Sequence, residues 1–157
     1  MTPAARARID AIVDLARRIA QGDASAAAVL HDAILERFVT YRQMNDAFRR
    51  VDGEIGREGR KYTRAFGFAR EREFWRMPAI AHLSRLRDVL GEAKSMHPDS
   101  GELVGHYTSH GLVVKRRPLG KRSRAVRERA QAKWAASGYV ARPFERFLTN
   151  ARGESTR

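Results

Sequence analysis

The sequence predicts a mainly α-helical fold with one β-hairpin. Apolar residues recur at three- and four-residue spacing through most of residues 4–94, which is the period of amphipathic helices. The period changes to two only around residues 103–115. The chain has 157 residues and no cysteine, so one domain with an arm is expected, without disulfides or thiolate metal sites.

The first predicted helix covers residues 4–20. Its apolar side chains lie on one face: Ile9, Ile12, Val13, Ala16 and Ile19. A core of three helices has no evident place for this segment. We therefore expect its apolar face to form a homodimer.

Two further helices are predicted before residue 52. Asp23 or Ser25 caps the second helix, which runs to about Arg37. Its expected buried residues are Val29, Leu30, Ala33, Ile34 and Phe38. Thr40 and Gln43 have the spacing of a capping box, which starts a third helix over 41–51. Its expected buried residues are Met44, Phe48 and Val51.

A long loop is predicted over residues 52–67, because four glycines interrupt a charged stretch that has almost no apolar periodicity. Pro78 suits the first turn of the next helix, over 78–94. The apolar face of that helix is Ile80, Leu83, Leu86 and Leu90. Residues 52–77 would then form an insertion rich in glycine and arginine.

The hairpin and a basic helix follow. Residues 103–107 and 112–115 alternate in polarity around a turn that contains His110 and Gly111. A basic helix is expected over 121–137, and an amphipathic piece with Phe144, Phe147 and Leu148 precedes a polar tail.

Positive charge increases steeply along the chain. The net charge is +13, made up of zero over residues 1–56, +3 over 57–114 and +10 over 115–157. Such a gradient indicates a polyanion as the partner of the C-terminal third.

The order of these elements resembles the winged helix-turn-helix superfamily of DNA-binding domains. The resemblance is carried by helices at 24–37, 41–51 and 78–94, the hairpin at 102–117 and the local pattern Val39-Thr40-Tyr41-Arg42-Gln43-Met44. It implies a helical core with a hairpin wing. The implied domains are an N-terminal helix at 1–22, a winged-helix-like domain at 23–117 with its insertion at 52–77, and a basic C-terminal arm at 118–157.

The resemblance also implies how DNA is contacted. Helix 78–94 would enter a major groove, with His82, Ser84 and Arg85 nearest the bases, and the basic end of the hairpin would follow the backbone. The long link at 52–77 and the acidic Asp88 and Glu92 depart from this pattern. Phosphate binding is therefore expected mostly on the loop and the C-terminal helix.

The strongest signal for function is a cluster of nine bases with one acid, Glu128, in residues 115–133. The bases are Lys115, Arg116, Arg117, Lys121, Arg122, Arg124, Arg127, Arg129 and Lys133. Charges of one sign at this density repel one another at low salt, so an anionic partner is expected. Nucleic acid is favoured over an acidic protein.

A second basic patch lies in the predicted loop, where Arg60, Lys61 and Arg64 are expected to contact nucleic acid. It is interleaved with Tyr62, Phe66, Phe68, Phe74 and Trp75. Aromatic side chains that lie among basic residues can stack on unpaired nucleotide bases. We favour the alternative that they anchor the core, with Tyr62 alone exposed.

A small metal-free ribonuclease is the main enzymatic alternative. His106 and His110 flank the hairpin turn near Lys115, and two histidines with a cation suffice for acid–base cleavage of RNA. Zinc bound by histidines is less favoured, and no motif indicates a metal or a cofactor.

These observations favour a non-enzymatic protein that binds duplex DNA in the cytoplasm, with DNA favoured over RNA and no membrane partner. It would act as a small transcription regulator or as an accessory factor of a phage, plasmid or other mobile element. A third alternative is an interaction subunit whose basic arm docks on RNA or an acidic protein.

Overall fold

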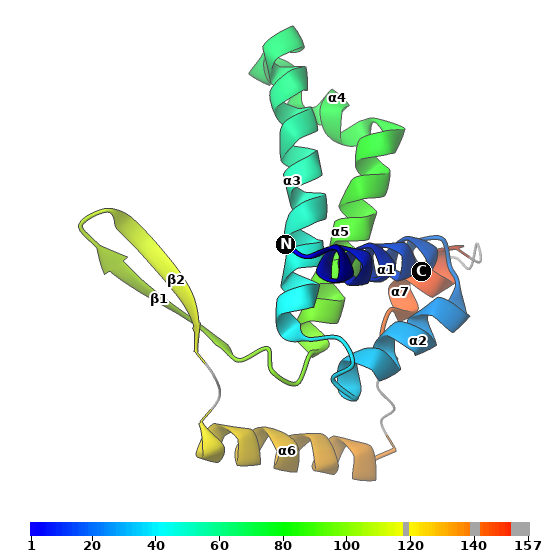
Figure 1. Ribbon diagram of the computed structural model, residues 1–157, viewed down its shortest axis with the longest axis vertical. Coiled ribbons are helices and arrows are strands. Elements are labelled where there is room, and N and C mark those ends of the chain that lie inside the picture. The colour runs from blue at the N-terminus through cyan, green and yellow to red at the C-terminus, as the bar shows by residue number, and fades with distance from the viewer. Residues whose placement is uncertain (118–119, 139–141, 152–157) are drawn as a thin grey trace. The chain divides into compact units, whose positions relative to one another are not determined.

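The computed structural model describes residues 1–117, 120–138 and 142–151 (Figure 1). Its helices and strands are, in chain order, α1 (Pro3–Ala20), α2 (Ala24–Leu35), α3 (Tyr41–Phe66), the 3₁₀ turn η1 (Phe68–Arg70), α4 (Glu71–Arg76), α5 (Pro78–Met96), β1 (Glu102–Thr108), β2 (Gly111–Arg117), α6 (Lys121–Ala136) and α7 (Glu145–Ala151). The prediction of a mainly α-helical chain is confirmed.

The chain divides into two compact units. Unit 1 comprises Met1–His97 and Phe144–Arg157, and unit 2 comprises Pro98–Pro143. These boundaries differ from the predicted ones at residues 22 and 117. Both α1 and α7 belong to unit 1, so the predicted C-terminal arm is divided between the two units.

Unit 1 is built on the antiparallel pair of α3 and α5, which Figure 1 shows side by side. Phe48 packs near Gly91, and the next turns are joined where Arg87 donates to Asp52 over 3.2 Å. The core of unit 1 includes Met44, Val51, Leu86 and Leu90, all buried.

The apolar face of α1 lies in this same core. Ile9, Ile12, Val13, Ala16 and Ile19 are buried, as α1 packs on α2, α3 and α5. The sequence predicted this apolar face correctly. The homodimer that was expected to form through the face no longer has a basis. The face is covered within the chain, because α1 packs on α3 and α5 and completes the core that these two helices form.

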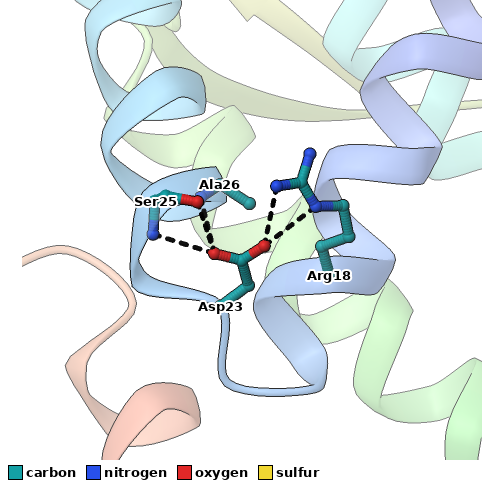
Figure 2. A network of polar contacts seen from close by, with 4 residues as sticks. All are labelled: Arg18, Asp23, Ser25 and Ala26. Carbon is teal, nitrogen blue, oxygen red and sulfur yellow. Dashed lines mark hydrogen bonds and ion pairs between the residues drawn. The ribbon is translucent and has the colours of Figure 1, made fainter.

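The corner between α1 and α2 is held by one carboxylate (Figure 2). Asp23 caps α2 by accepting from the Ser25 amide at 2.9 Å, the Ser25 hydroxyl at 2.6 Å and the Ala26 amide at 3.2 Å. Its other oxygen accepts from Arg18 Nε over 2.9 Å. The Ser25 hydroxyl, Arg18 and the Ala26 amide hold the pKa of Asp23 well below its ordinary value of 3.8.

The predicted end of the second helix is wrong. α2 stops at Leu35, and Arg37 adopts a positive φ of 58°, which turns the chain away. Phe38 is 75% exposed and Val29 is 55% exposed, although both were expected in the core. The buried face of α2 follows its alanines with Leu30 and Ile34, and Val29 projects about a third of a turn from that face.

The loop predicted over 52–67 is also wrong, because α3 continues to Phe66. Its buried face extends from Val51 to Ile55, and the next position on that face is Gly59, which faces the ring of Phe74. A glycine at a buried position interrupts the regular spacing of apolar residues by which an amphipathic helix is predicted from a sequence. Packing against Phe74 offsets the helix penalty of about 1 kcal/mol for each glycine.

Unit 2 contains an antiparallel pair of strands and one helix. The predicted hairpin falls on β1 and β2, which pair with His106 opposite Val113 and with Thr108 opposite Gly111 at the turn. α6 follows after Gly120. None of the described apolar side chains of unit 2 is buried, so this unit has no hydrophobic core among its described residues.

The Asp23 corner gives a pH-dependent prediction. Asp23→Asn keeps a capping side chain but removes the charge that faces Arg18. Because the folded pKa is depressed, the carboxylate stabilises the fold above its unfolded pKa of about 3.9, and this contribution is lost as the pH falls through the folded pKa. We expect the variant to melt a few degrees below the wild type at pH 7, with a difference that shrinks below about pH 4.

Thermal unfolding followed by circular dichroism measures this difference. Asp88→Asn is the control, because Asp88 is exposed and forms no ion pair within the described chain. A difference for Asp23→Asn that stays constant down to pH 2 would contradict the assignment.

Two glycine variants test the helical state of residues 52–66. Gly53 lies inside α3, where an added Cβ meets only the Arg57 guanidinium at 4.0 Å, so Gly53→Ala should stabilise unit 1 by about 0.5–1 kcal/mol. Gly67 has φ of 77° and ψ of 174°, a region restricted to glycine, so Gly67→Ala should destabilise it by about 1–3 kcal/mol. Urea unfolding checks both, and equal effects of the two variants would argue against the helix end at Phe66.

Candidate nucleic-acid interface

The predicted bases of α6 lie on two faces of an exposed helix. Arg122, Arg129 and Lys133 follow one another at spacings of seven and four residues, so they form one stripe along the helix. Arg124 and Arg127 lie on another side, three residues apart. All of these side chains are exposed except Arg127, which is half-buried. The helix therefore offers cations in more than one direction.

Acidic and basic residues are divided unevenly between the two units. Within unit 1, ion pairs join Arg18 with Asp23, Arg50 with Asp10, and Arg146 with Glu92. Unit 1 has twenty-one bases and fifteen acids, whereas unit 2 has ten bases and three acids.

The basic residues of β2 and α6 whose side chains the structure describes take no part in these ion pairs. Within the described residues, no ion pair engages Lys115, Arg117 or the bases of α6. Their positive charge is available to an external anion.

For the hairpin, the structure gives the backbone register, but it describes only some of the side chains of the predicted site. Lys115 pairs opposite Val104, and Arg117 pairs opposite Glu102. His110 lies in the exposed turn, where its backbone amide donates to Thr108 Oγ1 over 3.2 Å. The side chains of His106 and Arg116 lie outside those that the structure describes, so the ribonuclease alternative stays a prediction.

The structure separates the two bases predicted on α5. His82 is exposed on the first half of the helix. Arg85 is half-buried: its Nη2 donates to the Phe147 carbonyl over 3.2 Å and its guanidinium lies 5.8 Å from the Phe147 ring. The expectation that Arg85 reaches DNA bases stays a prediction, and the structure gives this side chain a structural role, because it binds α7 to α5.

The anchoring of α7 in unit 1 was not predicted from the sequence. Phe144 and Phe147 are buried in unit 1, and Glu92 accepts from the Phe144 amide over 3.0 Å while pairing with Arg146. Glu92 was expected only to repel phosphate. The two phenylalanines at a spacing of three residues were the available signal, but the partner on α5 lies fifty-two residues away in the sequence.

The second predicted patch lies on the last turns of α3. Arg60 and Arg64 are exposed and form no ion pair among the described residues, whereas Lys61 pairs with Glu58 over 2.8 Å. Arg57 precedes them on the same face of the helix, also exposed. The structure therefore brings Arg57, Arg60 and Arg64 together and assigns Lys61 to a local ion pair.

The expectations for the aromatic residues of this patch are largely wrong. Phe74 is buried as expected, but Phe66 is 53%, Phe68 85% and Trp75 40% exposed. Tyr62, expected to be exposed, packs 5.5 Å from Phe74 between ring centroids and donates to Glu73 over 3.2 Å. Burial, and then the hydrogen bond to Glu73, raise the pKa of the Tyr62 phenol. Because α3 is helical at Tyr62, the ring of Tyr62 lies against Phe74 and is half-buried.

A cleft opens beside these residues between α3 and α4, with a volume of about 380 Å³. The residues that line it are Asp52, Ile55, Gly56, Gly59, Tyr62, Thr63, Gly67, Phe68, Glu71, Phe74, Trp75 and Arg87.

No helix in the described part of the chain is long and apolar enough to cross a membrane. Among the described residues, no three potential ligand side chains gather as a metal site requires.

No protein-family model matches the chain, and no curated protein or solved structure matches it either. The resemblance to winged helix-turn-helix domains therefore stays a prediction. The candidate interface is defined by charge and exposure: the basic segment, residues 115–133, in unit 2 and the three arginines on α3 in unit 1.

A substitution at Arg85 tests its assignment to the fold. Arg85→Ala removes a charge-assisted hydrogen bond to the Phe147 carbonyl, so we expect a loss of about 1.5–3 kcal/mol in the free energy of unfolding. The salt dependence of any DNA binding should not change. His82→Ala is the control on the same helix and should leave stability unaltered. A stable Arg85→Ala protein with weakened DNA binding would restore the original expectation.

Proposed function

We propose that the protein binds nucleic acid, and duplex DNA in particular, through the basic segment. The observation that supports this most strongly is that Lys115, Arg117 and the six basic residues of α6 have no carboxylate partner among the described side chains. Phosphates are the anions that a run of arginines and lysines neutralises best. An acidic protein that offers carboxylates in place of phosphates is the alternative, and the exposed Leu112, Val114 and Val126 of unit 2 would suit such a partner.

The helical form of the segment favours duplex DNA over RNA. α6 has sixteen residues and extends about 24 Å at 1.5 Å per residue. The major groove of B-DNA, about 12 Å wide, admits a helix, whereas that of A-form RNA is too narrow. Bases on two faces of α6 can then contact the phosphates on both sides of the groove. In the cell, such a protein would serve as a small regulator or an accessory factor on DNA.

The winged-helix proposal for residues 23–117 is separate from this one. It would use the exposed His82 and the half-buried Ser84 on α5, without Arg85. Binding through α6 does not depend on it.

Fluorescence anisotropy tests the proposal with labelled duplex DNA, single-stranded DNA and RNA of equal length, in a salt series without added metal. The triple substitution Arg122→Ala, Arg124→Ala and Arg127→Ala removes three charges while alanine preserves the helix. If each of the three contacts one phosphate, the slope of log affinity against log salt for duplex DNA should fall by up to about 2.7.

The matched control is Arg6→Ala, Arg8→Ala and Arg49→Ala. These arginines are exposed in unit 1 without ion pairs among the described residues, so the same net charge is removed elsewhere. Its slope should equal that of the wild type. Equal slopes for both triple variants, or no duplex binding near physiological salt, would contradict the proposal. Cleavage of the RNA probe that His106→Ala and His110→Ala abolish would support a ribonuclease instead.

A further inference from the structure

Phe68 is the most exposed large apolar residue described, at 85%. The neighbouring aromatic side chains have partners: Phe66 lies 4.8 Å from Tyr62 and 5.5 Å from the Arg70 guanidinium, between centres. Trp75 lies 5.2 Å from Phe74. Phe68 has no such ring or cation partner among the described residues. Phe68 lines the same cleft as the exposed Trp75, so its ring belongs to an aromatic hollow beside cations and is not a single scattered surface residue.

The backbone holds Phe68 in this exposed position. Gly67 ends α3 with φ of 77°, and its amide donates to the Thr63 carbonyl over 2.8 Å. The 3₁₀ turn η1 begins at Phe68 and leads directly into α4, whose Phe74 is anchored in the core. The position of the ring is therefore set by a glycine turn between two packed elements.

Two hollows meet at Phe68. One is the cleft between α3 and α4, and the other is a shallower hollow of about 460 Å³ lined by Gly56, Gly59, Arg60, Thr63, Arg64 and Phe68. The two share Gly56, Gly59, Thr63 and Phe68. Because glycines have no side chain, the backbone of α3 forms the floor of both, and a flat group can approach the ring from beside the helix.

The charge around the ring is asymmetric. Arg57, Arg60 and Arg64 lie on one face of α3, exposed and without ion pairs among the described residues. The guanidinium of Arg60 lies back over Gly56, where an added Cβ would be 3.5 Å from Nη1. In the cleft, Asp52 is neutralised by Arg87, whereas Glu71 has no ion pair among the described residues. An anionic ligand would therefore lie on the arginine side.

We propose that unit 1 binds single-stranded nucleic acid, with an unpaired base stacked on Phe68 and the adjoining phosphates held by Arg57, Arg60 and Arg64. A flat apolar ring next to cations is the combination that single-strand binding uses, because every base has a π-face and every nucleotide a phosphate. Paired bases are already stacked on one another, so duplex DNA cannot use this ring. The inference extends the proposed function, since it adds a site in unit 1 that does not require α6.

The test uses the full-length protein and a labelled oligo(dT) of about a dozen nucleotides, within the usual site size. Phe68→Ala should weaken binding roughly ten- to a hundredfold, which is the range for the loss of one stacked base. Affinity for duplex DNA should not change. Phe38→Ala is the matched control: Phe38 is a 75% exposed phenylalanine that lines neither hollow, and its loss should have no effect.

The same pair is then measured in the Arg122→Ala, Arg124→Ala and Arg127→Ala background. This background removes three of the six basic residues of α6 and so weakens binding there, which means that failure of the duplex proposal and failure of the Phe68 proposal give different results. The Phe68→Ala effect on oligo(dT) should persist there. Equal affinity of Phe68→Ala and Phe38→Ala for oligo(dT) in both backgrounds would overturn the proposal.

A second measurement does not depend on a variant. Ultraviolet crosslinking to oligo(dT), followed by trypsin digestion after Arg64 and Arg70, should place the crosslink on the peptide of residues 65–70. Crosslinks confined to residues 115–133 would overturn the proposal.

Discussion

The packing of α3 against α5 is the constraint on which the rest of unit 1 depends. The two helices approach closely at glycines: Gly91 admits Phe48 on one side, and Gly59 on α3 admits Phe74 from the segment that connects the two. Their joined surface gives α1 an apolar face to cover, and α7 packs in turn on α1. It also sets where α3 ends, and so where the turn at Gly67 presents Phe68. The exposed aromatic site is a consequence of a long helix pair.

The sequence was informative where a buried face has an apolar side chain at each turn. The face of α1, the capping box at Thr40 and the apolar stripe of α5 are all visible in the spacing of residues. The period failed over 52–66, because Gly59 stands where an apolar residue would complete it. Tertiary packing then outweighs intrinsic propensity, which single-sequence patterns do not capture.

The candidate sites, like the helices, were predictable where the residues concerned lie close together in the sequence. They were not predictable where those residues lie far apart in the sequence. The bases of 115–133 are contiguous in the sequence, so their number and density were predictable. The pairing of Lys61 with Glu58, three residues apart, was also within reach of a helical assignment. The contact of Arg85 with Phe147 joins residues sixty-two positions apart. No pattern in the sequence connects them, so Arg85 was assigned to DNA from its place on the helix that the winged-helix resemblance puts in a major groove.

The two proposed sites would bind nucleic acid at different energetic cost. The described side chains of α6 make no buried apolar contacts, so the stability of this helix rests on intrinsic propensity, opposed by repulsion between its bases. Phosphates that neutralise those bases would relieve the repulsion and stabilise the helix, which couples its folding to binding. Phe68, by contrast, is held between α3 and α4 before any ligand arrives. Binding at α6 must therefore include an ordering cost that binding at Phe68 does not. Salt dependence is expected at both sites, because the arginines of α3 would neutralise phosphates as the basic residues of α6 do, whereas the stacking on Phe68 itself neutralises none.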